Sequence, residues 1–154
     1  MHFAHLSLSN LSRCLSNLDR WEDALLAVEE AVRILRPLAA NYPTVFRPPL
    51  ARSLTALSGI FSYLGRMPEV IQAVGDAVRL LRPLAMERAA VFSRELAKSL
   101  AMLSHYYSDT GRHEDALRTA LTNRCAQYGA RVAMCIACAY FAALRIPPSP
   151  SMTR

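Results

Sequence analysis

The residues best suited to chemistry are three cysteines late in the chain, Cys125, Cys135 and Cys138. The last two are separated by two residues, a spacing found in zinc sites and in redox pairs. Zinc needs four ligands, however, and no histidine follows Cys125. A redox pair of this kind is expected beside a strand–helix–strand pattern, which the segment lacks. We therefore expect no metal and no cofactor, with the cysteines acting as small apolar residues; a Cys-based metal-binding or redox protein is the alternative.

Motifs of other enzyme classes are incomplete or absent in the sequence. His113 and Glu114 begin the metalloprotease pattern, but Leu117 stands where that pattern needs its second histidine. Neither a glycine-rich phosphate loop nor a Gly-x-Ser-x-Gly elbow occurs. We therefore predict that the protein is not an enzyme and has no catalytic residues.

A repeated sequence segment indicates which structural units would position any functional site. The sequence Ala-Val-Arg-Ile-Leu-Arg-Pro-Leu-Ala at 31–39 returns at 77–85 with a single change, 46 residues later. The same shift carries Ser12 to Ser58 and then to Ser104. Self-similarity at a fixed spacing predicts a stack of equivalent units.

Each unit has the pattern of a helix, a tight turn and a second helix. In the second unit the apolar residues follow helical spacing up to Leu64, Gly65 interrupts them, and the spacing resumes at Val70. Gly65 and Gly111 suit the left-handed position that follows the end of a helix. Asp19 occupies the matching place in the first unit.

Prolines and charges predict where the second helices end. We expect these helices to close or kink at Pro37 and Pro83, and residues 41–46 to form a loop with an apolar anchor. Cations are favoured near the C-terminus of a helix, which is the role we expect for Arg33, Arg36, Arg79 and Arg82.

The unit resembles the tetratricopeptide repeat (TPR) family, whose first helix carries large, large, small and large residues before a Gly-Arg-like turn and an alanine-bearing second helix. The second unit matches through Leu54, Leu57, Ser58, Phe61, Gly65, Ala77 and Pro83. The first and third units match through Leu8, Leu11, Ser12, Leu15, Trp21, Ala24, Ala31 and Pro37, and through Leu100, Leu103, Ser104, Tyr107, Gly111 and Ala116. The spacing is longer than the minimal unit of about 34 residues, so the chain looks most like the kinesin-light-chain-like branch.

The resemblance implies an all-α fold, a right-handed α-solenoid of stacked antiparallel helix pairs with a period of 46 residues. Residues 5–50 and 51–96 would form complete units and residues 97–123 a partial third unit. We expect residues 124–146 to form an apolar helical segment outside the repeat, and residues 147–154 a disordered tail.

The resemblance also implies a concave groove, lined by the first helix of each unit, that binds a peptide or a helix. Carried over position by position, the partner-binding residues are Arg13, Asn17, Arg52, Tyr63, Lys98, His105 and Asp109. Three of them are cations that would form one positive stripe, so we expect a non-catalytic interaction module with a protein or peptide partner of acidic character. The alternative is a structural or oligomerising fragment of a larger multidomain protein, which self-associates through its open repeat ends.

Composition and charge narrow the class of protein further. The chain has 154 residues, 53% of them hydrophobic, enough for one domain with a buried core. Its net charge of +6 comes almost entirely from dispersed arginines, so we expect no nucleic-acid partner. The longest apolar stretch is shorter than the roughly 20 residues of a membrane span, so we expect no membrane association. Without a secretory leader pattern, reduced cysteines and a cytoplasmic location are expected.

Overall fold

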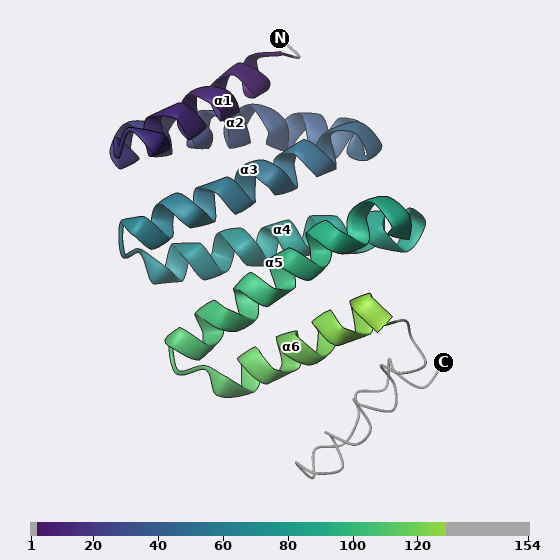
Figure 1. The fold of residues 1–154 in the computed structure, drawn as a ribbon. Helices are drawn as coiled ribbons and strands as arrows, with labels where there is room; N and C mark the ends of the chain where they lie inside the picture. The colour runs from purple at the N-terminus through teal and green to yellow at the C-terminus, as the bar shows by residue number, and fades with distance from the viewer. Residues whose placement is uncertain (1–2, 129–154) are drawn as a thin grey trace.

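The computed structural model describes residues 3–128, with side chains through Asn123, and this part of the chain contains helices and no strands (Figure 1). The all-α prediction is therefore confirmed for these residues. Residues 124–128 form the end of the last helix, and the rest of the predicted apolar segment and tail lies outside the described residues. The helices are α1 (Ala4–Asn17), α2 (Trp21–Asn41), α3 (Pro43–Tyr63), α4 (Met67–Glu87), α5 (Ala89–Asp109) and α6 (His113–Tyr128).

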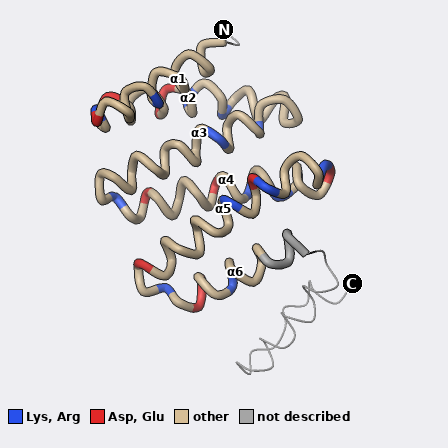
Figure 2. The backbone as a smooth tube through the Cα atoms, viewed as in Figure 1, with Lys and Arg blue, Asp and Glu red and all other residues tan. Residues whose placement is uncertain are grey.

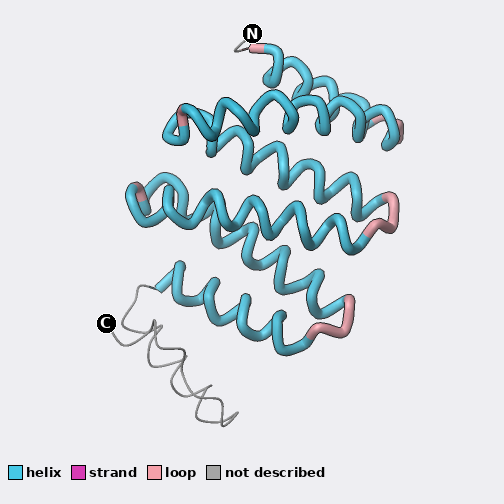
Figure 3. The backbone as a smooth tube through the Cα atoms, turned by 180° about the vertical axis from the view of Figure 1, so that it is seen from behind, coloured by secondary structure: helices cyan, strands magenta, loops and turns pink. Residues whose placement is uncertain are grey.

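Each helix packs chiefly against the helices that precede and follow it in the sequence. The front and rear views agree that α1, α3 and α5 lie on one side of the molecule and that α2 and α4 lie on the other (Figures 1 and 3). We call the exposed surface of α1, α3 and α5 the odd-helix face. Between the two layers lies one continuous apolar core, whose most deeply buried side chains include Leu35, Leu81 and Leu100.

The turns that join α1 to α2, α3 to α4 and α5 to α6 share one geometry. At the middle turn Gly65 has a φ of 71° and donates its N–H to the carbonyl oxygen of Ser62, while Arg66 donates to that of Phe61 (2.9 Å). In this Schellman arrangement a left-handed residue satisfies the last carbonyl groups of a helix. The prediction of left-handed residues is confirmed, because the same arrangement recurs at Asp19 and Gly111, with φ values of 56° and 74°.

An arginine at each of these turns connects the helix that ends to the helix that begins. The guanidinium of Arg66 lies 4.7 Å from the centre of the Phe61 ring, and its Nε donates to Oε1 of Glu69 (2.9 Å). This hydrogen bond lowers the pKa of Glu69, because it favours the charged carboxylate. The equivalent contacts are those of Arg112 with Tyr107 and Asp115, and that of Arg20 with Asp23.

The second helices do not end at their prolines, so the predicted helix end at Pro37 and Pro83 is wrong. Helix α2 continues through Pro37 to Asn41, and α4 continues through Pro83 to Glu87. A proline inside a helix removes one backbone hydrogen bond. Buried apolar residues lie on both sides of Pro37, at Leu35 and Ala39, so packing holds the last turn in helical form.

The predicted loop at 41–46 is also wrong, because a single residue, Tyr42, connects α2 to α3. Pro43 occupies the first position of α3, where the missing N–H would have no helical partner in any case. A single residue, Arg88, likewise connects α4 to α5. As a result, α3 and α5 run across the positions at which the sequence units were divided, and the helix pairs of the structure are divided at Tyr42 and Arg88.

Small serines lie where paired helices approach each other. The buried hydroxyl of Ser12 donates to the carbonyl oxygen of Ala24 in α2 (2.9 Å). Ser104 makes the equivalent bond from α5 to Ala116 in α6, also at 2.9 Å. Ser58, at the same position of α3, donates within its own helix instead. The small side chains permit close helix packing, and the hydroxyls of Ser12, Ser58 and Ser104 each have a hydrogen-bond partner.

We predict that Leu57→Ala lowers the free energy of unfolding by about 2–5 kcal/mol, because removing a buried leucine leaves a cavity. Leu57 is 8% exposed, whereas Leu11, at the equivalent position of α1, is 49% exposed. Leu11→Ala is therefore the matched control, and it should cost much less. Urea unfolding of both variants measures the difference, and equal losses would contradict the prediction.

A second prediction concerns two glycines in different backbone conformations. Gly65→Ala should destabilise the protein by about 1–2 kcal/mol, because L-residues resist positive φ. Gly75 lies inside α4, and an added Cβ would meet nothing within 4 Å at either glycine. Gly75→Ala should therefore stabilise the helix by about 0.5–1 kcal/mol. Thermal unfolding of the two variants should move the midpoint in opposite directions, and a shift of the same sign would refute this account of the turn.

Candidate functional site

All seven residues predicted to bind a partner are exposed, and all lie on α1, α3 or α5. They are Arg13 and Asn17 on α1, Arg52 and Tyr63 on α3, and Lys98, His105 and Asp109 on α5. Of these residues, only His105 and Asp109 interact directly, with 3.4 Å between Nε2 and Oδ2. The structure therefore places the predicted residues on the odd-helix face as a dispersed set.

The three predicted groove cations have no acidic partner among the described residues. Arg52 and Lys98 make no ion pair, and Arg13 donates only to the side-chain oxygen of Asn10 (3.3 Å). Helices α1 and α3 contain no aspartate or glutamate at all (Figure 2). The odd-helix face of these two helices is therefore positively charged, because nothing on the same helices neutralises its arginines.

Three arginines of α2 and α4 that were predicted to lie near helix C-termini form ion pairs instead. Neither α2 nor α4 has a basic residue in its last turn, so the predicted role at the helix C-terminus is wrong. Both helices continue past their prolines, which leaves these arginines in the helix interior. There Arg33 pairs with Glu30 and lowers the pKa of that carboxyl through a side-chain hydrogen bond. Arg36 and Arg79 both pair with Asp76.

A pocket of about 320 Å³, which sequence reasoning missed, lies where α2, α3 and α4 meet. Asp76 is its most enclosed charged group, with 18% of its side chain exposed, and Nη2 of Arg36 lies 3.8 Å from its Oδ2. The two arginines and the aspartate neutralise each other in part, so the pocket has only one unbalanced positive charge. No local motif reveals the contact, because Arg36 and Asp76 come from different units. The lining residues are Arg36, Leu50, Leu54, Asp76, Arg79 and Leu80.

A stacked aromatic pair joins the first two helix pairs at the odd-helix face. The rings of Trp21, at the start of α2, and Tyr63, at the end of α3, are 4.0 Å apart between centroids and inclined by 15°. Tyr63 is nevertheless 72% exposed, so one side of the stack remains open to a ligand. The sequence predicted Tyr63 as a binding residue but gave no sign of its contact with Trp21, which stands 42 residues earlier.

The described residues contain no group of three or more histidine, cysteine, aspartate or glutamate side chains arranged to hold a metal ion. Cys14 is exposed, and Cys125, Cys135 and Cys138 lie beyond the described side chains. Within the same part of the chain no helix has the length and apolar character needed to cross a membrane.

No protein-family model matches the chain, and no curated protein gives a significant match to it.

The open aromatic stack leads to a third prediction. Tyr63→Ala should shift the fluorescence emission of Trp21 to longer wavelength and lower the free energy of unfolding by about 0.5–1.5 kcal/mol, since the stack contributes beyond simple burial. Trp21 is the only tryptophan of the chain, so the emission has one source. Tyr42→Ala is the control, because Tyr42 is also exposed and contacts Phe46 instead. Unchanged emission in the Tyr63 variant would show that the two rings do not stack in solution.

Proposed function

We propose that the protein is a non-catalytic interaction module of the TPR type, which binds an acidic peptide or helix along its odd-helix face. The observation that carries this proposal is the charge of α1 and α3, two helices with exposed arginines and no carboxylate. A surface of one sign attracts a partner of the opposite sign and orients it during the encounter. Lys98 on α5 extends the same charge toward the third helix pair.

We also propose that the fold is a TPR-type, right-handed solenoid, and two further observations support its repeating units and its period of 46 residues. Left-handed turns of the same hydrogen-bonding pattern stand at Asp19, Gly65 and Gly111, each 46 residues from the next. The successive packing of helices gives a layered array in which the odd helices form one surface. A surface of this kind is long and continuous, which suits a peptide that contacts several units.

In the proposed complex the cations provide charge and the aromatic stack provides an apolar contact. Arg13, Arg52 and Lys98 would pair with carboxylates of the partner, and the open side of Tyr63 would receive an apolar side chain. Arginine suits this role because its planar group binds carboxylates in a bidentate manner. Solvent-exposed pairs contribute little each, so affinity would come from several contacts along the surface.

A fourth prediction tests this surface with a fluorescein-labelled peptide rich in glutamate. The triple variant Arg13→Ala, Arg52→Ala and Lys98→Ala should bind it about tenfold more weakly than the wild type and with a flatter salt dependence, as expected for three exposed charge contacts. Fluorescence anisotropy at two salt concentrations measures both effects. A peptide with glutamine in place of every glutamate should bind weakly to both proteins.

The matched control is Arg33→Ala, Arg36→Ala and Arg79→Ala, which removes the same amount of charge from arginines that are already ion-paired. This variant should bind nearly as well as the wild type. If it loses more affinity than the first variant, the binding surface lies on the side of α2 and α4. If both variants bind equally well, charge on the odd-helix face has no part in recognition.

A further inference from the structure

The pocket where α2, α3 and α4 meet has an apolar part and a charged part. Its apolar lining comes from Leu50 and Leu54 of α3, which are buried, and from the half-buried Leu80 of α4. Its exposed lining groups, Arg36 and Arg79, belong to α2 and α4, so the pocket opens on the side of these two helices. It is therefore separate from the odd-helix face and from the partner proposed to bind there.

The guanidinium groups of the pocket keep hydrogen-bond donors for a ligand. Arg79 donates from Nη2 to Oδ1 of Asp76, and its Nε has no partner among the described residues. Nη2 of Arg36 lies 3.8 Å from Oδ2 of Asp76, which is close enough for an ion pair but too long for a hydrogen bond. A guanidinium carries several N–H groups. An anion can therefore accept hydrogen bonds from both arginines without first displacing the carboxylate of Asp76.

The net charge of the pocket selects the charge of its ligand. Arg36 and Arg79 are positive and Asp76 is negative, so one positive charge remains unbalanced. A ligand with one negative charge would neutralise the pocket, whereas a cation would add to the unbalanced charge, which is unfavourable. A planar carboxylate suits two guanidinium groups in particular, because each of its oxygens accepts hydrogen bonds in the plane of the group.

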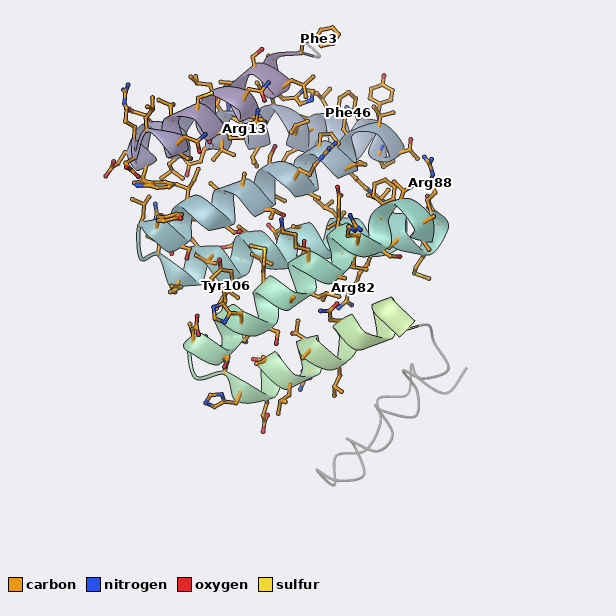
Figure 4. The ribbon with its side chains drawn as sticks, in the orientation of Figure 1. Phe3, Arg13, Phe46, Arg82, Arg88 and Tyr106 are labelled. Atoms are coloured by element: carbon orange, nitrogen blue, oxygen red, sulfur yellow. The ribbon has the colours of Figure 1, made fainter. Side chains whose placement is uncertain are left out.

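The repeat shows that an arginine at this position does not depend on an ion pair. Arg82 stands 46 residues after Arg36 and extends from α4 on the side of α6 (Figure 4). Thr122 of α6 occupies the position equivalent to Asp76, so a hydroxyl replaces the carboxylate there. Arg82 makes no ion pair with a described residue. The arginine thus recurs where no carboxylate is placed to meet it, which leaves Arg36 available to an external anion.

We propose that the pocket binds a small-molecule monocarboxylate with an apolar chain of about eight carbon atoms. Its volume of about 320 Å³ corresponds to roughly ten water molecules at about 30 Å³ each, and so to a ligand of about ten non-hydrogen atoms. The carboxylate binds between Arg36 and Arg79, and the chain lies against Leu50, Leu54 and Leu80. An apolar lining with a few polar groups that orient the ligand is typical of small-molecule sites.

The probe for this proposal is octanoate, a monocarboxylate of this size, used below the concentration at which it forms micelles. Isothermal titration calorimetry of the full chain should show saturable binding of one molecule per chain. Octanamide has the same length but no charge, so it should bind about tenfold more weakly. Acetate has the charge but no apolar chain, so it should show no binding over the same concentration range.

Two substitutions test the arginines directly. Arg36→Gln and Arg79→Gln should each weaken octanoate binding about tenfold, because each removes a positive charge that faces the carboxylate. The matched control is Arg33→Gln. Arg33 stands 46 residues before Arg79 and forms the equivalent ion pair with Glu30 on α2, but it does not line the pocket. The control variant should bind octanoate as the wild type does.

A substitution of the aspartate should have the opposite effect. Asp76→Asn keeps the size of the side chain, removes the internal competitor for both arginines and leaves the pocket with two positive charges. It should therefore strengthen octanoate binding about fivefold. Circular dichroism of every variant checks that the helical fold is retained.

Four outcomes would overturn the proposal. The first is the absence of saturable octanoate binding, and the second is equal affinity for octanoate and octanamide. The third is an equal loss of affinity in the Arg33 and Arg79 variants, or a loss in Asp76→Asn, because the carboxylate would then bind elsewhere. The fourth is tighter binding of a glycine-serine peptide that ends in leucine with a free carboxylate, because the ligand would then be the end of a peptide chain.

Discussion

The left-handed residue between paired helices is the constraint on which the rest of the structure depends. Because Gly65 adopts a positive φ, Arg66 can close the end of α3 and begin α4 within three residues. The same geometry recurs at Asp19 and Gly111. In the first and third helix pairs a serine of the first helix also bonds to the second helix, Ser12 to Ala24 and Ser104 to Ala116, whereas Ser58 in the middle pair bonds within α3.

Packing between successive helices separates the residues that stabilise the fold from those free to bind. Each helix buries one side against its predecessor and another against its successor. In α3 and α5 the remaining side is the odd-helix face, where Arg52 and Lys98 are exposed without an ion pair. In α1 two sides remain open, since no helix precedes it within the described residues. The described residues thus present positive charge on α1 and α3, and exposed leucines, Leu11 and Leu18, at α1 and its C-terminal end.

The sequence predicted the features that recur within a unit. The left-handed positions at 19, 65 and 111 follow from glycine, or from aspartate at a matching place, and the structure has them. The exposure of the seven candidate binding residues also follows from helical periodicity, because polar positions alternate with the apolar ones. Helical periodicity predicts that these residues are exposed, but it does not predict binding, which also depends on the chemistry of the partner.

Features that depend on contacts between units were not predictable in the same way. Arg36 meets Asp76, and Trp21 meets Tyr63, across helix pairs whose relative position no local pattern encodes. The prediction that the second helices end at Pro37 and Pro83 failed for a different reason. The rule that proline ends a helix rests on the loss of one backbone hydrogen bond. At Pro37 the packing of the buried residues on either side outweighs that loss.

The short connections have a consequence for how proteases meet this fold. Between residues 3 and 128 no connection is longer than three residues, and two consist of one residue each. A protease must bind an extended segment much longer than that, so it can cut only after at least part of a helix has opened. Cleavage in this region therefore measures the population of locally unfolded molecules, and the bond cut first identifies the helix pair with the smallest opening free energy.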